Sequence, residues 1–372
     1  MRIVEALQLH PWDLAPREAA ALQSELASRV IREGDPPEST VRYVAGCDCA
    51  FDKPNRRAVA AVVVLAYPSL EVVEQVAVEA AVTFPYVPGL LSFRETPPLL
   101  QAFERIKQRP DLLMVDGHGY AHPRRFGYAC HLGVLLDVPT VGVAKSRLIG
   151  EADTVAGPRG SRGDLIHDGE VIGSMLRTQQ GVRSIFVSIG HRISLESAER
   201  WVLRCSTKYR VPEPTRLADR LAGGAKRRML AATLEIVIEQ RAGEPGRWEW
   251  VAADDAVVFR HELAPMPTHY GCSADLINEA DGELLDVMLV DNRQHDRAER
   301  TSVRVVDVLE RSDGDHKLLA VPADQPEQRL DGVRERIWRW YVEQKKPVTR
   351  WGGEDAALAL IASCRKTEAG SE

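Results

Sequence analysis

A segment that begins at residue 111 constrains the fold of this chain more than any other. The apolar run DLLMV (111–115) predicts a buried strand, FGYACHLGVLLD (126–137) predicts a helix, and TVGVAK (140–145) predicts a second strand. The loop between the first strand and the helix (116–125) holds one acid, two glycines, two histidines and two arginines. In sheets with helices between the strands, sites gather at the carboxyl ends of the strands. The pattern therefore predicts a site at Asp116.

Three more strands are predicted upstream. The runs 41–51, 58–67 and 72–84 are rich in Val and Ala and are joined by short links, which is typical of an antiparallel meander. Helical spacing is seen at 16–33 and 98–108. A meander followed by alternating helix and strand predicts an α/β mixed sheet covered on both faces.

The composition changes near AGGAKRRMLAA (222–232). Residues 1–230 carry 30 Lys and Arg against 26 Asp and Glu, whereas residues 231–372 carry 18 against 28. Five of the seven tryptophans also lie in the second part. Because 372 residues exceed one ordinary domain, we predict two domains, 1–230 and 231–372.

The second part reads as short strands separated by frequent turns, which predicts a small β-barrel. Helical patterns at 333–344 and 355–366 are expected to pack outside it. The predicted strands are TLEIVIEQ (233–240), WEWVA, AVVFRHEL, DVMLV, VRVVDVLE and KLLAVP.

Composition also disfavours several classes of protein. The sequence has no run of 18 apolar residues, and its first twenty residues lack the basic and apolar regions of a signal peptide. The six cysteines show no CxxC spacing. We expect a reduced, cytoplasmic chain with no membrane contact and no zinc site.

Asp48 is embedded in the apolar strand VAGCDCAF, where an uncompensated charge is costly. Two interpretations remain open. Asp48 is salt-bridged or partly exposed, or neighbouring strands bring Asp48 and Asp116 together to share a metal. Mg²⁺ requires oxygen ligands and neutralises carboxylates that repel each other. Two such ions at about 4 Å activate a water and stabilise the leaving oxygen of a phosphodiester.

The segment PYVPGLLSFRE (85–95) contains a stiff Pro-aromatic-Pro-Gly turn and then Glu95. Such a turn is either structural or a finger whose Tyr86 stacks on or wedges between bases.

The polar loop offers further groups. Gly117 and Gly119 would let the backbone approach a ligand, and His122 would orient a water. Arg124 and Arg125 would meet phosphate.

Three more residues stand out around this loop. Lys145 ends the next strand and is expected to place its ammonium on phosphate. His131 lies inside the predicted helix and is expected to be packed. Asp219 in EPTRLAD is either a further acid or an ordinary helix start.

Together these segments resemble endonuclease V, in order and at the family's spacing, over about residues 35–222. The resemblance implies a ribonuclease H-like fold and a DNA-repair endonuclease that uses Mg²⁺, or Mn²⁺ in its place. It also implies cleavage of nucleic acid at the second phosphodiester 3′ to a deaminated base, chiefly hypoxanthine. The segments that carry the resemblance are GCDCAF, PYVPGLLSFRE, VDGHGYAHPRRFGYACHLGVLLDVPTVGVAKSRL and YRVPEPTRLAD.

The resemblance also implies residue roles. It makes Asp48, Glu95 and Asp116 metal ligands, Asp219 a fourth acid, His122 and Lys145 catalytic, Tyr86 a strand-separating wedge, and Pro88, Gly89 and Gly117 parts of the base pocket. A pocket lined by backbone suits hypoxanthine, whose edge is read by N–H and C=O groups.

Residues 233–372 resemble a soluble inorganic pyrophosphatase of the small-barrel family, which binds several Mg²⁺ ions and phosphate. The segments concerned are EIVIEQRAGEPGRWEW, FRHELAPMPTHYG, DGELLDV, DGDHKLLAVP and WRWYVEQ. The matching positions are Glu239, Arg247, Glu249, Arg260, Tyr270, Asp281, Asp286, Asp315, Lys317 and Tyr341.

The sequence departs from that family's pattern in three places. Glu283 stands where the family's central Asp would activate water, and one added methylene exceeds the tolerance of a preorganised site. Val342 replaces a lysine that binds phosphate. The acid before Asp315 is either Glu310 or Asp313.

Three functional hypotheses follow. The chain is an inosine-directed nuclease with a pyrophosphatase-like domain of reduced or absent activity, or it is bifunctional and also hydrolyses pyrophosphate or a larger diphosphate. A non-catalytic nucleic-acid-binding scaffold is the third. The acidic balance of residues 231–372 predicts that this part does not extend a nucleic-acid groove.

Overall fold

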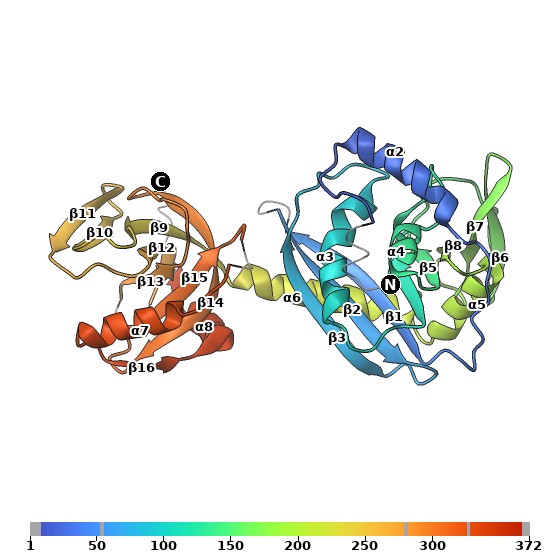
Figure 1. Ribbon diagram of the computed structural model, residues 1–372. Helices are drawn as coiled ribbons and strands as arrows, with labels where there is room; N and C mark the ends of the chain where they lie inside the picture. Colours follow the sequence, from blue (N-terminus) through green and yellow to red (C-terminus); the bar gives the residue numbers. More distant parts are fainter. Residues whose placement is uncertain (1–8, 53–55, 279–281, 326–327, 367–372) are drawn as a thin grey trace. The chain divides into compact units, whose positions relative to one another are not determined.

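The computed structural model describes residues 9–52, 56–278, 282–325 and 328–366. The chain divides into two compact units, residues 1–226 and 227–372. The division falls inside helix α6 (Glu213–Ala231), as Figure 1 shows. Of the helices in the described ranges, none is long and apolar enough to cross a membrane.

An eight-stranded mixed sheet forms the N-terminal unit, with the order β3-β2-β1-β4-β5-β8-β7-β6. Strands β1, β4 and β5 run parallel to one another, and every other neighbouring pair in this sheet is antiparallel. The predicted α/β mixed sheet is therefore confirmed. Its strands are β1 (Tyr43–Asp52), β2 (Arg57–Ala66), β3 (Val72–Ala81), β4 (Leu112–Asp116), β5 (Thr140–Ala144), β6 (Arg162–His167), β7 (Glu170–Leu176) and β8 (Ile185–His191).

The central strands β1 and β4 of this sheet are buried on both faces. Successive side chains of a strand point to opposite sides, and an apolar core lies on each side. Ala45 and Leu113 belong to one core, which includes helices α3 and α4, and Val44 and Leu112 belong to the other, which includes α5 and α6. Figure 1 shows α3 lying across the strands β1–β3. The three covering helices not yet bounded are α3 (Leu91–Arg105), α4 (Tyr128–Leu136) and α5 (Leu195–Cys205).

Helix α6 begins in direct contact with the central strand β1. A Cβ atom on Gly46 would lie 2.1 Å from the carbonyl carbon and oxygen of Pro214, which is too close for any side chain. Glycine at position 46 therefore lets the first turns of α6, which carry Asp219, pack against the strand that carries Asp48.

Two helices differ from the sequence prediction. The helix predicted over 16–33 ends early, as α2 (Pro16–Leu26) and the 3₁₀ turn η1 (Ala27–Arg29). The chain then becomes extended, and the Ile31 carbonyl accepts the amide of Arg192 at 2.7 Å.

The helix predicted over 98–108 begins earlier, at Leu91, and runs through Pro97 and Pro98. Proline has no amide hydrogen and usually ends a helix. The proline pair therefore predicts a boundary that the structure does not have, and the helical position of Glu95 is not apparent from the sequence. Strands β6–β8 and helix α5 were not predicted either.

The C-terminal unit contains a closed five-strand barrel. Strands β13, β15, β14, β9 and β12 pair in that order, and β13 also pairs with β12. The predicted small barrel is confirmed, although β12 was not among the predicted strands. The barrel strands are β9 (Thr233–Gln240), β12 (His269–Ile277), β13 (Leu284–Leu289), β14 (Arg300–Arg311) and β15 (Lys317–Pro322).

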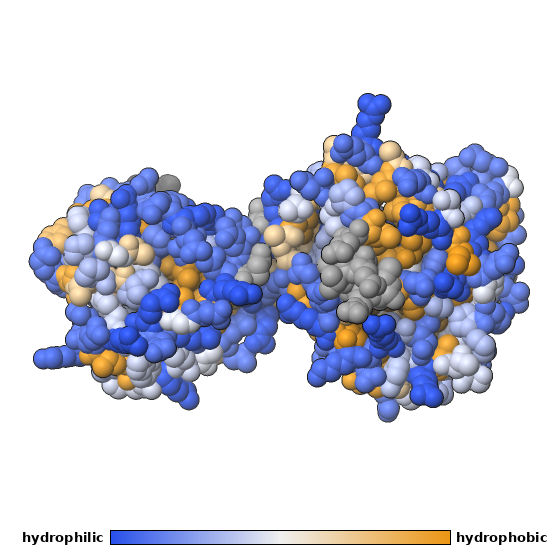
Figure 2. All heavy atoms as spheres, viewed as in Figure 1, coloured by the Kyte–Doolittle hydropathy of each residue, from blue (hydrophilic) through white to orange (hydrophobic). Residues whose placement is uncertain are grey.

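Smaller elements flank this barrel. Helices α7 and α8 pack against it through separate apolar clusters. The flanking elements are the hairpin β10 (Arg247–Val251) and β11 (Ala256–His261), the helices α7 (Val333–Glu343) and α8 (Gly353–Ser363), and the short strands β16 (Val348–Trp351) and β17 (Arg365–Lys366). Hydrophilic residues cover most of the visible face of each unit (Figure 2).

Candidate active site

Three acids meet at one edge of the N-terminal sheet. Cys47 of β1 pairs with Val115 of the parallel strand β4, so the next residues, Asp48 and Asp116, emerge beside each other. Glu95 extends from α3 and is only 7% exposed. Asp116 therefore lies at a strand end, as predicted, and the carboxylates of Asp48 and Glu95 lie near it.

The three carboxylates repel one another. Burial, and then the charge of Asp116, raises the pKa of Asp48 to about 7. Burial, and then the charge of Asp48, raises the pKa of Glu95 to about 8, although the nearby Tyr128 hydroxyl opposes this shift. Full ionisation of the group is therefore unfavourable without an added cation.

Two further predicted residues join this group. Lys145 directly follows β5, and its Nζ lies 2.6 Å from Oδ2 of Asp116. Burial opposes ionisation of Lys145, but the hydrogen bond and charge of Asp116 raise its pKa. Asp219 is an exposed residue of α6 whose charge raises the pKa values of both Asp48 and Lys145.

We tested whether these residues fit a divalent cation. In the described part of the chain, no three His, Cys, Asp or Glu side chains converge as a preformed metal site. The donor chemistry nevertheless fits, since three carboxylates share one edge and Asp48 and Glu95 are disfavoured as ions by burial and by mutual repulsion. Hard divalent cations prefer oxygen ligands and relieve such repulsion.

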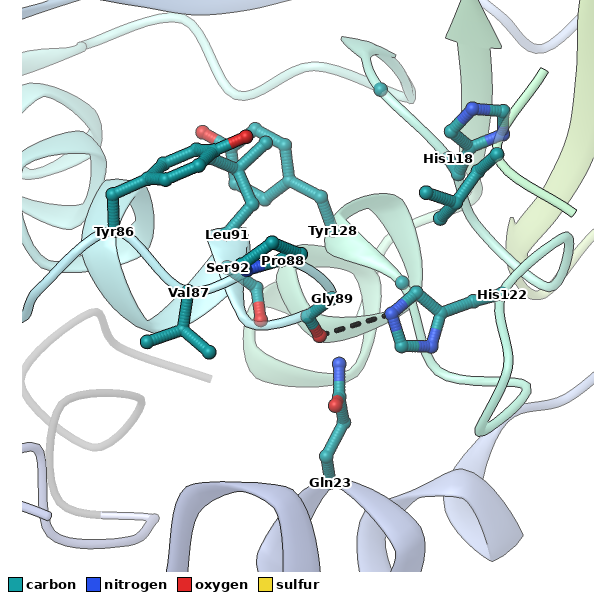
Figure 3. Close-up of a pocket in the computed structure, with 13 residues that line it drawn as sticks. Gln23, Tyr86, Val87, Pro88, Gly89, Leu91, Ser92, His118, His122 and Tyr128 are labelled. Carbon is teal, nitrogen blue, oxygen red and sulfur yellow. Dashed lines mark hydrogen bonds between the residues drawn. The ribbon is translucent and has the colours of Figure 1, made fainter. Parts of the chain in front are cut away.

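A pocket of about 210 Å³ opens beside Asp116, at Gly117. Its walls come from α2, from the turn before α3, and from the loop between β4 and α4 (Figure 3). The lining residues are Gln23, Tyr86, Val87, Pro88, Gly89, Leu91, Ser92, Gly117, His118, His122, Gly127, Tyr128 and Leu148. The predicted residues Tyr86, Pro88, Gly89 and Gly117 are thus brought together.

His122 holds one wall of this pocket. Its Nδ1 accepts the Arg124 amide at 3.2 Å, so Nε2 is the nitrogen that donates to the Gly89 carbonyl at 3.0 Å, as Figure 3 shows. Burial, and then the charge of Arg124, lowers the pKa of His122 to about 4. The imidazole is therefore neutral near pH 7 and holds the Gly89 carbonyl, while its expected role in orienting a water stays a prediction.

Gln23 is a pocket residue that the sequence did not reveal. Its side chain is 1% exposed. Its Nε2 donates to the Phe126 carbonyl at 2.6 Å, and its Oε1 accepts Nε of Arg124 at 2.6 Å. Arg124 in turn donates to the Gly89 carbonyl at 2.9 Å. Because these partners are remote in sequence, no local pattern pointed to Gln23.

Several loop residues also have contacts within the fold. Arg125 is paired with Glu170 at 2.8 Å, whereas Arg124 donates to the neutral oxygens of Gln23 and Gly89, and the expected phosphate contacts of both stay predictions. A Cβ atom on Gly119 would lie 2.0 Å from the Ile189 carbonyl oxygen, so this glycine serves the contact between the loop and β8. His131 is fully buried, as expected.

Tyr86 projects from the turn at the pocket rim and is 72% exposed. A turn residue with a purely structural role would bury a ring of this size. Its exposure favours the interpretation in which the ring contacts a ligand.

The C-terminal unit gathers a second group of charged residues. The Lys317 ammonium bonds to both Asp286 and Asp315. Nη1 of Arg311 lies 2.6 Å from Asp315, and the same guanidinium also pairs with Asp313. Arg311 was not predicted. Although burial opposes it, Lys317 and then Arg311 lower the pKa of Asp315.

Four more predicted residues line the same group. The Arg247 guanidinium lies 4.7 Å from the ring centre of Tyr270 and 3.9 Å from Asp286. Burial raises the pKa of Glu239 to about 7, although Glu239 accepts the Trp250 amide at 2.8 Å. Burial, and then the charge of Tyr270, raises the pKa of Tyr341, although Lys317 opposes this shift.

The remaining predicted positions of this unit lie elsewhere. Glu249 and Arg260 pair with each other at 2.6 Å on the exposed hairpin. Glu283 is exposed, and Asp281 lies outside the described residues. Glu310 pairs with Arg350 of β16, so Asp313 is the acid that shares Arg311 with Asp315.

Comparisons with known proteins agree with the N-terminal geometry. The family model for endonuclease V matches residues 24–220. Endonuclease V of Gloeobacter violaceus is 53% identical over 216 residues, which cover 57% of this chain and 87% of the relative. The relative from Trichormus variabilis is 51% identical and is covered to 99%, over 59% of this chain.

Solved structures lead to the same assignment. Endonuclease V of Streptomyces avermitilis shares 45% identity at a TM-score of 0.56, over 58% of this chain and 95% of that one. The Ciona intestinalis enzyme was solved with a 24mer DNA containing an inosine followed by a ribo-adenosine. It shares 32% identity at a TM-score of 0.50, over 57% of this chain and 97% of that one. An inorganic pyrophosphatase from Ehrlichia chaffeensis covers 36% of this chain and 94% of its own, with 20% identity and a TM-score of 0.33. This identity and this TM-score are too low to assign a family.

The acid group at the sheet edge, the adjoining pocket and the match over residues 24–220 all lie in the N-terminal unit. The chain belongs to the endonuclease V family of nucleases.

Proposed function

We propose that the N-terminal unit is a DNA-repair endonuclease that cleaves nucleic acid at the second phosphodiester 3′ to a deaminated base, with hypoxanthine as the preferred base. The observation that carries this proposal is the group of Asp48, Glu95 and Asp116, which resists full ionisation without an added cation and lies directly beside the pocket at Gly117. Hydrolysis of a phosphodiester requires such a charge arrangement and a nearby place for the target nucleotide.

The pocket supports an extruded purine as its occupant. The backbone of Gly89 and Gly117 forms part of its wall, and hypoxanthine can be read by backbone N–H and C=O groups. The DNA bound to the Ciona enzyme contains inosine. Tyr86 at the rim is suited to fill the space that the extruded base leaves, by stacking on its former neighbours.

In this proposal Asp48, Glu95 and Asp116 hold divalent cations, with Mg²⁺ as the physiological ion and Mn²⁺ as a substitute. The bound ion would supply charge neutralisation and a more acidic water. Lys145 binds a phosphate oxygen, Asp219 adjusts the charge of the group, and His122 keeps the Gly89 wall in place.

The Asp116→Asn variant tests the proposal. It keeps the shape of residue 116 but removes one carboxylate, so cleavage of an inosine-containing strand with Mg²⁺ should fall by at least roughly 10²–10³-fold. Asp168→Asn, at an exposed turn, is the matched control and should cleave normally. Strand nicking is measured with inosine and adenine at the same position, in DNA and in RNA. Undiminished cleavage by Asp116→Asn would refute the assignment.

For the C-terminal unit, we propose a barrel of the pyrophosphatase type that has lost its reaction. The contacts of Lys317 support this, because its ammonium is held by the two aspartates that a phosphate-bound metal would need. The exposed position of Glu283 supports it too. Bifunctional hydrolysis and a non-catalytic scaffold are the competing proposals.

Phosphate release from pyrophosphate by the full chain separates these proposals. With Mg²⁺ we expect no release above background, from pyrophosphate or from a deaminated nucleoside triphosphate. The Asp116→Asn protein is assayed in parallel so that the nuclease site cannot be the source. Turnover near the roughly 10 s⁻¹ of an ordinary enzyme would favour the bifunctional protein.

A further inference from the structure

We propose that the nuclease unit has a second nucleic-acid contact, a basic groove that binds the phosphodiester backbone of the substrate strand beyond the cleavage site. This inference rests on the proposed function. The groove has a volume of about 490 Å³ and shares Lys145 with the acid group. It also contains Arg177, Arg183 and Arg210, and none of the described residues that line it is acidic.

Lys145 is ion-paired with Asp116, but the described residues place no carboxylate against the guanidinium groups of Arg177 and Arg210. Arg177 donates to the carbonyl oxygens of Ala156 and Val155 at 2.6 and 2.8 Å. Arg210 donates to the carbonyl oxygens of Lys145 and Ser184, both at 2.8 Å. A carbonyl satisfies an N–H group without a compensating formal charge. Both guanidinium groups therefore fix the walls of the groove while their charge remains available to a ligand.

Arg183 is the cation best placed to contact a ligand directly. It is exposed on the loop before β8, and its backbone carbonyl is held by Nε of Arg210 at 3.0 Å. The loop is therefore anchored while the side chain extends toward solvent. An anchored backbone with an extended guanidinium is suited to grip phosphate.

The neighbouring surface has the opposite charge. A second hollow of about 800 Å³, along the β6–β7 hairpin, is lined by Glu151, Asp153, Asp164 and Asp168, with Arg147 and His167 as its basic residues. The two hollows therefore differ in charge, one basic and the other acidic. A polyanion held at Lys145 would be attracted along the groove and repelled from the hollow.

The groove also matches a nucleic-acid strand better than a small anion. Apolar side chains of Val155, Met175, Val182 and Phe186 lie among the cations. A strand presents charged phosphates alternating with apolar sugar and base faces, and proteins that follow single strands combine cations with such surfaces.

Binding to strands of increasing length tests the inference. The full chain carrying Asp116→Asn is used so that the strand is not cut, and Arg183→Glu is added to it. Removing one cation from the phosphate backbone should reduce the slope of log affinity against log salt by about 0.7–0.9, which is about five- to eightfold in affinity over a decade of salt concentration. The reversed charge should weaken binding further. Arg109→Glu, at an exposed site after α3, is the matched control.

The design separates this inference from the proposed function. A backbone contact does not depend on the base, so Arg183→Glu should weaken inosine-containing and lesion-free strands by the same factor. If no variant prefers inosine, the proposed function is refuted, but the inference about the groove is not. An unchanged affinity and salt slope for Arg183→Glu, with the inosine preference intact, would overturn the groove alone. Strands too short to reach the groove should bind both proteins equally.

Discussion

The two units each collect acidic residues around a lysine, but the electrostatic outcome is opposite. In the N-terminal unit, Asp48 and Glu95 have raised pKa values, and Lys145 is the basic side chain bonded to the group, through Asp116. In the C-terminal unit, Lys317 and Arg311 lower the pKa of Asp315. Carboxyl groups with raised pKa values gain from a cation bound from solution, whereas a carboxylate already stabilised by Lys317 and Arg311 gains less. Residue types alone do not distinguish an active site from a structural ion-pair network.

The tyrosines of the two sites differ in their exposure to solvent. Tyr86 is 72% exposed at the rim of the N-terminal pocket, whereas Tyr270 and Tyr341 are 2% and 3% exposed. An exposed ring can contact a ligand without rearrangement, while a buried ring contributes packing and hydrogen bonds to the fold.

The largest effect that would sharpen this contrast is expected from Lys317→Met. The change removes the cation between Asp286 and Asp315, which leaves Arg311 on Asp315 and the more distant Arg247 on Asp286. The free energy of unfolding of the C-terminal unit should fall by about 3–5 kcal/mol. Urea unfolding followed by tryptophan fluorescence measures it, since this unit holds five of the seven tryptophans. Lys346→Met, at an exposed site, is the control; equal losses in both variants would remove the contrast.

A smaller effect is expected from Tyr86→Ala. Loss of base stacking should weaken binding of an inosine-containing strand by about 1–3 kcal/mol, while stability should stay within about 0.5 kcal/mol because the ring is exposed. Tyr86→Phe keeps the ring and should restore affinity. Binding of uncut strands and thermal unfolding are compared for the three proteins. A loss of stability without a loss of affinity would assign the turn a structural role.

The last prediction is a pH dependence of the stability of the metal-free protein. A carboxyl whose folded-state pKa is raised stabilises the fold less as it ionises, so Asp48 and Glu95 should lower the melting temperature as pH rises from about 4 to about 8. Mg²⁺ should therefore raise the melting temperature more at pH 8 than at pH 5.

Glu239 titrates in the same range, so the measurement is the difference between the wild type and Asp48→Asn. That variant should show a flatter pH profile and a smaller response to Mg²⁺. Identical profiles in the two proteins would mean that the acid group does not hold the cation.

Much of the fold could be read from the sequence because strongly apolar strands such as 111–115 and 140–145 leave few alternatives. The failures have specific physical causes. Pro97 and Pro98 concealed the first turns of α3, which tertiary packing keeps helical. The β6–β7 hairpin has weakly apolar strands, although its turn at Asp168 and Gly169, both with positive φ, is a recognisable hairpin sequence.

The sequence could predict those site residues that the sheet topology places near the ends of neighbouring strands. Asp48 and Asp116 follow from two neighbouring parallel strands, and Lys145 follows from the third. Gln23 could not be found in this way, because its hydrogen-bond partners lie about a hundred residues away in the sequence. Arg311 is different, since its partners Asp313 and Asp315 are close in the sequence and the segment RSDGD was a local signal for it. Glu249 and Arg260 show the converse, since matching positions in a sequence need not converge in the structure.

The contacts of Gln23 bear on how a minimal nuclease should be trimmed. A fragment that starts at residue 35, where the recognisable motifs begin, would keep every acid of the reaction centre. It would nevertheless discard α2, and with it the amide that joins Arg124 to Phe126 behind the Gly89 wall. We expect such a truncated protein to keep cleavage activity and to lose base selectivity. The reason is that α2, which completes the pocket wall, lies outside the motifs that carry the family resemblance.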